Sequence, residues 1–348
     1  MEIKFILPPN YNQPVGGYKV IFQYANWLSK RNHDVHIYFM DLDEVFGKKQ
    51  LRWMKRKLLR QSGITDEVTW FNFESNVKLH FNVNHKEVED IDNGIVVATF
   101  WKTASTVLKT KTSSSKKYYL IQDFEIFATS EANVVDTWHL PLQKIVVSKW
   151  LKQKATDLGE EATLVPNFIN SNEFYRKDFK ILNPTVSMLW HDNPRKGSKL
   201  GLAALKIVRK ENPDLKAIFF GKGDKPVGLP DWITYYHGAN IEELRDEIYG
   251  KSSIYLMTSE FEGWGLTAME AMAVGVPVIS TDNGGIRNFA DESSAILIPI
   301  NNMQAMVDAL SKLLDDSRLQ IKLRENAMNK IRDFSLDNSG ILLEKIFR

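Results

Sequence analysis

The sequence predicts an α/β protein built from two doubly wound domains that face each other across a cleft. Short apolar runs alternate with longer amphipathic stretches along the chain, which is how strands and helices alternate in such folds. The pattern restarts near the middle, and 348 residues exceed what one hydrophobic core usually spans. Because doubly wound sheets bind ligands beyond the carboxyl ends of their strands, the cleft is the expected site.

The expected strands are short runs that are apolar nearly throughout, as in sheets buried on both faces. In the first half they are Ile3–Leu7, Val35–Phe39, Ile95–Phe100, Tyr118–Ile121 and Ile145–Val147. In the second half they are Val186–Leu189, Ala217–Phe220, Ile254–Met257, Val278–Ser280 and Ala295–Ile298. Helical patterns lie between them, for example at Tyr18–Ser29, Lys199–Lys210, Glu242–Tyr249 and Met303–Leu314.

Residues 162–184 are rich in Pro, Asn and charge, and this composition predicts a linker with a boundary near Pro166. We therefore expect an N-terminal domain over 1–165, a C-terminal domain over 166–332 and a last amphipathic helix in 333–348.

Composition excludes several classes of protein. With 45 basic and 43 acidic residues the net charge is +2, which argues against a dedicated nucleic-acid binder. The absence of cysteine excludes disulfides and thiolate chemistry and fits a cytoplasmic location. No apolar run approaches the roughly 18 residues of a membrane span, and the first residues do not have the layout of a signal peptide.

Residues 253–282, SIYLMTSEFEGWGLTAMEAMAVGVPVISTD, carry the most chemistry. A strand ends near Ser259, and a glycine-containing loop leads into a helix. Thr267 and Glu270 have the spacing of a capping box, which predicts that the helix starts at Thr267. The amides of Ala268 and Met269 would then point into the loop and form an anion site at the positive end of the helix dipole.

Two carboxylates bracket this expected anion site, Glu262 in the loop and Glu270 in the first helical turn. Carboxylates are good acceptors for sugar hydroxyls, so the set suits a phosphate flanked by hydroxylated rings, which is the shape of a nucleotide sugar. The alternative is that Glu270 is only a cap and that Gly263 and Gly265 are only turn residues.

The string EGWGLTAMEAMAVGVPVIST, with seven residues between its two glutamates, resembles the signature of retaining glycosyltransferases of the large family 4 type. Those enzymes have the GT-B architecture of two Rossmann-like domains. The glycine pair Gly16-Gly17 after the first strand resembles the family's N-terminal glycine loop. The stretch VVSKWLKQKATDLG with LVPNFINSNEF, and Arg195-Lys196-Gly197 at a helix start, resemble its entry to the second domain and its donor-phosphate region.

The resemblance implies a role for each matching residue. Glu270 would bind the ribose hydroxyls of the donor and Glu262 would contact the transferred sugar. Arg195 and Lys196 would neutralise the diphosphate. Backbone amides near the sugar and diphosphate would come from Gly263, Trp264, Gly265, Leu266 and Thr267.

The resemblance also implies that Gly16 and Gly17 let the N-terminal loop close on the donor phosphates or the acceptor. One departure lies at His191, in LWHDNPRKG, where the family usually has an arginine. Arg195 beside Lys196 would replace that charge, and His191 would border the donor.

The string YYLIQDFEIF (118–127) resembles bacterial rhamnosyltransferase-like members that build surface polysaccharides. It predicts that Gln122, Asp123 and Glu125 follow a strand and face the cleft, with Asp123 orienting the acceptor. The alternative is a solvated loop.

The resemblance implies transfer with retention of anomeric configuration, and we expect neither a metal nor a cofactor besides the nucleotide-sugar co-substrate. Basic side chains and the helix start could stabilise the leaving diphosphate by preorganised electrostatics. Asp41-Leu42-Asp43 is an Asp-x-Asp string, but one such triplet is weak evidence for a metal and a solvated loop is the alternative.

Residues 47–62, GKKQLRWMKRKLLRQS, hold seven basic and no acidic side chains among apolar ones. Such a helix could lie on an anionic membrane surface, and acceptors of the resembled family are often lipid-linked glycans. The expectation is a protein peripheral to the inner membrane face. The alternative is an ordinary solvated helix.

Other functions are also compatible with these sequence patterns. A nucleotide-sugar epimerase or a sugar phosphorylase shares the architecture, and a non-catalytic sugar-binding subunit of a glycosylation complex is a further alternative. A dehydrogenase is disfavoured because no G-x-G-x-x-G follows the first strand. In the resembled family the final helix crosses back to the N-domain, and an apolar face made by Ile341, Leu342, Leu343, Ile346 and Phe347 would serve for this.

Overall fold

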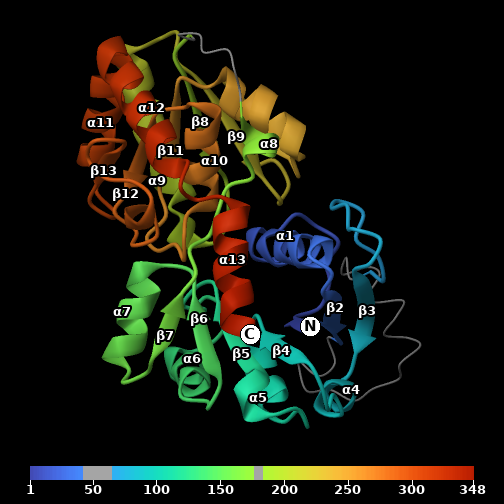
Figure 1. Cartoon of the computed structure of the whole chain (residues 1–348). Coiled ribbons are helices and arrows are strands. Elements are labelled where there is room, and N and C mark those ends of the chain that lie inside the picture. Colours follow the sequence, from blue (N-terminus) through green and yellow to red (C-terminus); the bar gives the residue numbers. More distant parts are fainter. Residues whose placement is uncertain (42–64, 176–182) are drawn as a thin grey trace. The chain divides into compact units, whose positions relative to one another are not determined.

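A computed structural model describes residues 1–41, 65–175 and 183–348, and the chain divides into two compact units (Figure 1). The first unit comprises Met1–Asn167 and Leu336–Arg348, and the second comprises Phe168–Ser335. The basic segment 47–62 and Asp43 lie outside the described residues, so the expectations placed on them stay predictions.

The first unit contains one parallel sheet of seven strands, in the order β3-β2-β1-β4-β5-β6-β7. The strands are β1 (Glu2–Leu7), β2 (Asp34–Met40), β3 (Lys78–Val83), β4 (Ile95–Ala98), β5 (Lys117–Ile121), β6 (Gln143–Val146) and β7 (Ala162–Leu164). Its helices are α1 (Gly16–Lys30), α4 (His85–Glu89), α5 (Trp101–Leu108), α6 (Glu131–Trp138), α7 (Lys149–Asp157) and α13 (Leu336–Phe347). The order reverses between β1 and β4, which is the topological switch point of a Rossmann-like sheet.

The last helix, α13, packs beside α1 within the first unit (Figure 1). The Trp27 indole Nε1 donates to Asp337 Oδ1 at 2.6 Å, and a Cβ added at Gly340 would lie 2.6 Å from the same indole. Leu343 is buried against this unit, whereas Ile341 is 52% exposed. The apolar run near the C-terminus is therefore divided between the core and the surface.

The second unit contains a parallel sheet of six strands, in the order β10-β9-β8-β11-β12-β13. The strands are β8 (Thr185–Leu189), β9 (Lys216–Gly221), β10 (Ile233–His237), β11 (Ile254–Met257), β12 (Val278–Thr281) and β13 (Ile296–Ile298). Its helices are α8 (Ser171–Phe174), α9 (Ser198–Glu211), α10 (Leu266–Val274), α11 (Met303–Asp315) and α12 (Ser317–Ile331). Its switch point lies between β8 and β11.

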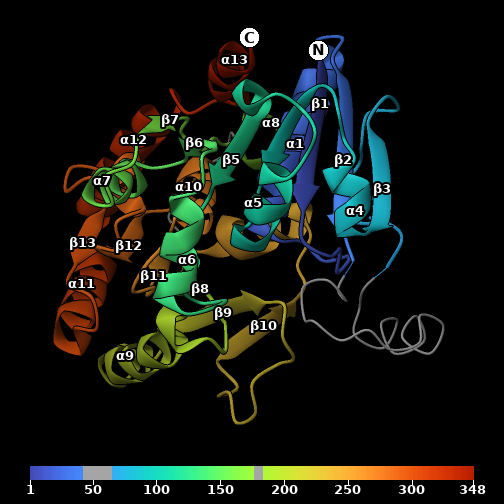
Figure 2. The ribbon, with the colours of Figure 1, turned by 90° about the horizontal axis from the view of Figure 1, so that it is seen from below.

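Helices cover both faces of this second sheet, which explains why its strands are apolar nearly throughout. One core joins α9 and α11 to the sheet through residues such as Leu205 and Leu310, and these two helices lie side by side in Figure 2. A second core joins α10 and α12 to the opposite face through residues such as Met272 and Ala327.

Two doubly wound α/β units are thus confirmed, but three strands were not predicted: β3, β7 and β10. Each lies at an edge of its sheet and is largely half-exposed or exposed. These three edge strands therefore lack the continuous apolar run that marks the central strands. β7 also lies within the segment 162–184, which was expected to be a linker, so that expectation is wrong for its first residues.

Candidate functional site

The candidate site of the second unit lies at its switch point, where β8 and β11 end. After β8 the chain forms a 3-10 turn, Pro194–Lys196, and after β11 it enters the loop that carries Glu262. The two segments are joined directly, because Thr258 Oγ1 donates to the Lys196 carbonyl at 2.6 Å and the Glu260 amide donates to the Arg195 carbonyl at 2.7 Å. The switch point thus brings together two motifs that lie far apart in the sequence.

The close contact between the Pro194–Lys196 turn and the chain after β11 requires a glycine at position 197. The φ of Gly197 is +64°, and an added Cβ would lie 2.2 Å from the Thr258 carbonyl oxygen. Both the left-handed backbone and the close approach exclude a side chain. The glycine of the Arg-Lys-Gly string therefore allows the turn to contact β11.

Lys196 and Glu262 form an ion pair at this point, with Nζ and Oε1 2.6 Å apart. The lysine side chain is 27% exposed and the glutamate side chain 15%, so the pair is only partly screened by solvent. The sequence assigned these residues to different parts of a donor, whereas the structure joins them. An anionic ligand at Lys196 would compete with Glu262.

The helix that follows, α10, begins at Leu266 and not at Thr267, and the predicted capping box is wrong. Its N-cap is Gly265, which has a φ of +97° and makes no side-chain cap. The amides of Ala268 and Met269 donate to the Gly265 carbonyl at 3.1 and 3.2 Å and so do not point into the loop. In an α-helix the first amides lack intrahelical acceptors, and here these belong to Leu266 and Thr267.

Glu270 is 8% exposed, and its carboxylate accepts a hydrogen bond from the Tyr249 hydroxyl at 3.2 Å. This contact replaces the predicted cap. Thr267 instead interacts through its side chain with the Tyr255 hydroxyl. Thr267 and Lys196 both line a cavity of about 10 Å³, which is room for about one water molecule. The α10 start and the lysine turn therefore border the same space.

A third loop, which follows β12, supports the glutamate loop, and it was not predicted from the sequence. The Glu262 amide donates to the Asn283 carbonyl at 3.1 Å. An added Cβ at Gly285 would lie 2.5 Å from the Trp264 carbonyl oxygen. The signal that could have indicated this loop is the glycine pair that follows the apolar run ending in Ser280.

Trp264, Arg195 and His191 occupy different surroundings. The Trp264 indole is 3% exposed and donates to Met269 Sδ at 3.2 Å, so it belongs to the core. The Arg195 guanidinium lies 5.9 Å from the Phe261 ring. His191 Nδ1 accepts from the Asn193 amide at 2.9 Å, and burial, followed by the charge of Lys196, lowers the His191 pKa. His191 therefore helps to shape the turn as a neutral ring.

In the first unit, two of the predicted residues meet. Gly16 is the first residue of α1, and the Gly17 carbonyl accepts a hydrogen bond from Gln122 Nε2 at 3.1 Å. An added Cβ at Gly17 would lie 3.4 Å from the same nitrogen, which is an ordinary van der Waals contact. The glycine pair thus brings the start of α1 against the residue that follows β5.

Asp123 is half-buried, and its Oδ1 accepts from the Phe124 amide at 2.8 Å. Glu125 was expected beside it as a group that faces the cleft, and this expectation is wrong. Glu125 is only 6% exposed, and its Oε2 accepts from the Trp101 amide at 2.7 Å and from the Tyr119 hydroxyl at 3.3 Å. It holds the start of α5 from within the core, and burial raises its pKa to about 8.

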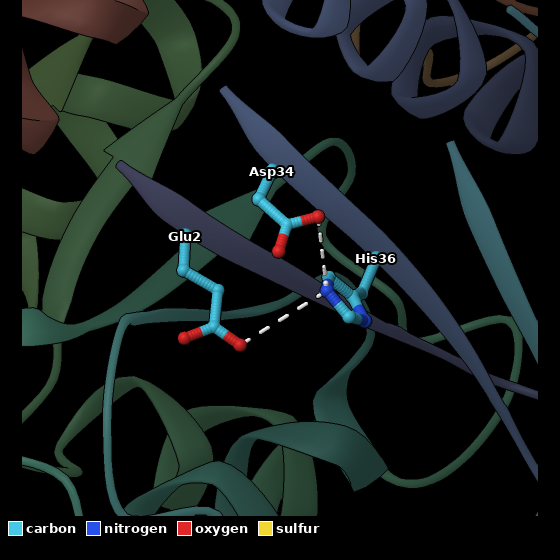
Figure 3. Close-up of side chains that lie close together, drawn as sticks. All are labelled: Glu2, Asp34 and His36. Atoms are coloured by element: carbon cyan, nitrogen blue, oxygen red, sulfur yellow. Dashed lines mark ion pairs between the residues drawn. The ribbon is translucent and has the colours of Figure 1, made fainter. Parts of the chain in front are cut away.

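Glu2, Asp34 and His36 are the one group of three potential metal ligands among residues 1–41, 65–175 and 183–348 (Figure 3). They lie at the amino ends of β1 and β2, opposite to the edge where doubly wound sheets bind ligands. Glu2 Oε1 already pairs with Lys4 Nζ at 2.7 Å, and Asp34 Oδ1 pairs with Lys78 Nζ at 2.8 Å. We interpret the group as an ion-pair network.

Residues 172–330 match the family model "Glycosyl transferases group 1". D-inositol 3-phosphate glycosyltransferase of Corynebacterium glutamicum is 31% identical over 181 residues, which are 47% of this chain and 42% of the relative. The capsular polysaccharide biosynthesis glycosyltransferase CapM of Staphylococcus aureus is 21% identical over 339 residues, 88% of this chain and 87% of CapM.

The fold is also shared with solved structures. HepE of Anabaena, crystallised with UDP and glucose, superposes with a TM-score of 0.74 at 15% identity, over 99% of this chain and 98% of HepE. None of the helices in the described part of the chain has the length and hydropathy needed to cross a membrane. The chain therefore has the two parallel-sheet α/β units of the GT-B fold, and its residues 172–330 match the model of the glycosyl transferases group 1 family.

Proposed function

We propose that the protein is a retaining, metal-independent glycosyltransferase. It would move a sugar from a nucleotide-diphosphate sugar to a hydroxyl of a glycan or lipid-linked glycan acceptor, in the synthesis of surface polysaccharide or glycoconjugate. The observation that supports this most is the Lys196–Glu262 ion pair beside the start of α10, at the switch point of the family-matched unit. The polysaccharide role of CapM and the UDP and glucose bound to HepE are consistent with it.

In this proposal the chain stabilises charge on the leaving group. Lys196 and Arg195 would neutralise the diphosphate, and the first amides of α10 would donate to it. Glu262 would accept from the transferred sugar once the diphosphate competes for Lys196. The bond from the anomeric carbon to the phosphate oxygen breaks, and the bond to the acceptor oxygen forms on the same face. The acceptor proton passes to the departing phosphate oxygen.

The test is to incubate the protein with a panel of nucleotide sugars and candidate acceptors and to assay released nucleoside diphosphate. We expect one donor to be consumed, unchanged turnover in EDTA, and a product whose anomeric configuration by NMR matches the donor. Binding of a donor without turnover, under any acceptor tried, would favour a non-catalytic sugar-binding subunit instead.

We further propose that the basic segment 47–62 attaches the enzyme to the cytoplasmic face of an anionic membrane, close to a lipid-linked acceptor. Seven basic side chains without an acidic one carry this proposal. Co-sedimentation with anionic liposomes should fall for the double variant Lys55→Glu/Arg56→Glu. Equal sedimentation of variant and wild type would count against membrane attachment.

A further inference from the structure

A buried tyrosine from another part of the unit contacts Glu270. The Tyr249 hydroxyl donates to Glu270 Oε2 at 3.2 Å, and the tyrosine is fully buried. Its ring packs edge-on against Phe220 at 5.8 Å and Tyr255 at 5.6 Å between centroids. A ring enclosed in this way has few positions open to it, so its hydroxyl is a fixed donor.

The Tyr249 hydroxyl stays protonated and can therefore always donate a hydrogen bond. Burial, followed by the charge of Glu270, raises the Tyr249 pKa well above its ordinary value. The hydroxyl therefore keeps its proton across the working range of pH. A buried carboxylate is costly unless hydrogen bonds compensate for lost water, so this contact favours one orientation of the Glu270 carboxylate.

The backbone that delivers Tyr249 is unusual. The expected helix Glu242–Tyr249 is instead one π-helical turn, Glu243–Ile248, followed by a short 3-10 turn, Tyr249–Lys251. Single π-helical turns are rare in proteins, and those that occur are often found at functional sites. The π-helical turn contacts α10, and Tyr249, the residue that directly follows it, donates to the α10 carboxylate.

We propose that Tyr249 is a positioning residue for the nucleoside of the donor: it orients the Glu270 carboxylate so that the ribose hydroxyls can donate to it. This inference rests on the proposed function, in which Glu270 binds the ribose. Tyr249 acts through Glu270 and does not touch the substrate. Its contribution belongs to the binding of the ribose hydroxyls and not to the chemical step.

The test uses Tyr249→Phe, which removes the hydroxyl and keeps the ring. The probes are UDP, GDP and ADP, each compared with its 2′,3′-dideoxy counterpart by isothermal titration calorimetry. For the diphosphate that wild type binds, we expect the affinity for the ribose form to fall about tenfold in the variant. The affinity for the dideoxy form should stay within twofold, and saturating turnover should stay within about threefold.

Tyr118→Phe is the matched control, because Tyr118 is also buried and its hydroxyl donates to the Ile346 carbonyl at 2.9 Å in the first unit. It should leave the ribose-to-dideoxy affinity ratio unchanged. That ratio does not depend on the folded fraction of a sample, so partial misfolding of Tyr249→Phe would not obscure the result.

The outcomes separate the inference from the proposed function. If wild type binds none of the diphosphates, or does not distinguish ribose from dideoxyribose, the proposed role of Glu270 fails. If wild type distinguishes them and Tyr249→Phe does so equally well, the role of Tyr249 is overturned. Loss of the distinction in Tyr249→Phe, with Tyr118→Phe unaffected, supports it.

Discussion

Lys196 Nζ lies 2.6 Å from Glu262 Oε1, although the two residues are 66 positions apart in the sequence. The pair spans the switch point of the second sheet, which is where a doubly wound sheet binds its ligand. Before a ligand arrives, the lysine charge is compensated by the glutamate. In the proposed reaction, a diphosphate would displace that carboxylate, and the freed carboxylate would become available to a sugar hydroxyl.

Glu262→Gln should separate binding from turnover. The substitution removes the charge that compensates Lys196, so nucleoside diphosphate should bind about two- to fivefold more tightly. Turnover should fall at least about tenfold, because the sugar loses its charged acceptor. Calorimetry and steady-state kinetics give the two numbers. Glu247→Gln, which removes the exposed pair with Lys251, is the control and should change neither. Wild-type turnover in Glu262→Gln would remove Glu262 from the mechanism.

Asp123→Asn should lower turnover at least about tenfold if Asp123 orients the acceptor as a charged group. Asparagine can still accept from the Phe124 amide, so the local backbone should be kept. The affinity for the nucleotide donor should not change. Asp136→Asn, at an exposed position of α6, provides the comparison. Equal turnover of Asp123→Asn and wild type would exclude this role.

Gly197→Ala should destabilise the second unit by about 3 kcal/mol, because the new Cβ meets the Thr258 carbonyl and the backbone has positive φ. Gly228→Ala is a matched control: its φ is +76° and nothing lies within 4 Å of its added Cβ. It should cost only about 1 kcal/mol, from the backbone alone. Urea unfolding measures both. Similar losses in the two variants would show that the contact with Thr258 is unimportant.

Glu125 should make the first unit less stable at alkaline pH. Burial raises its pKa to about 8 in the folded protein, so the folded state keeps a proton that the unfolded chain releases at lower pH. The free energy of unfolding should therefore fall as pH rises from about 4.5 to 8. Glu125→Gln should remove this fall. Urea midpoints at pH 5, 7 and 9 test it, and parallel curves for variant and wild type would contradict it.

Glu344 should stabilise the attachment of α13 at neutral pH. Its hydrogen bond with Arg348, aided by those with His33 and Arg31, lowers the Glu344 pKa to about 2. A depressed carboxyl pKa contributes stability above the unfolded value that is lost as pH falls toward 2. Glu344→Gln should thus lower the melting temperature at pH 7, and by less at pH 4.

Glu325→Gln, at an exposed position of α12, is the control for Glu344→Gln and should leave the melting temperature unchanged at both pH values. An effect of Glu344→Gln that is as large at pH 4 as at pH 7 would show that charge is not responsible.

Local sequence patterns predicted the central strands and the position of the glutamate loop, because continuous apolar runs and glycines act over a few residues. They did not predict how α10 begins, since Gly265 in the left-handed conformation displaced the cap expected from Thr267. Nor did they predict the partner of Glu270. Tyr249 lies 21 positions away, in a segment whose pattern indicated only a helix.

Contacts between residues of separate secondary-structure elements were the hardest to predict from the sequence. Gln122 was expected to face the cleft, and its contact with the Gly17 carbonyl, 105 positions earlier, was not predicted. Glu125 was also expected to face the cleft, whereas it accepts from the Trp101 amide inside the core. Such contacts depend on how β5 and its neighbours are arranged, and composition and spacing carry no information about them.

The return of α13 to the first unit determines the order in which the protein can be completed during synthesis. The segment Phe168–Ser335 is translated before Leu336–Arg348, so the first unit lacks its last helix until the whole second unit has been synthesised. Until that piece emerges, the side of α1 that contacts Gly340 and Asp337 has no covering helix. The first unit, whose synthesis begins first, is therefore completed last.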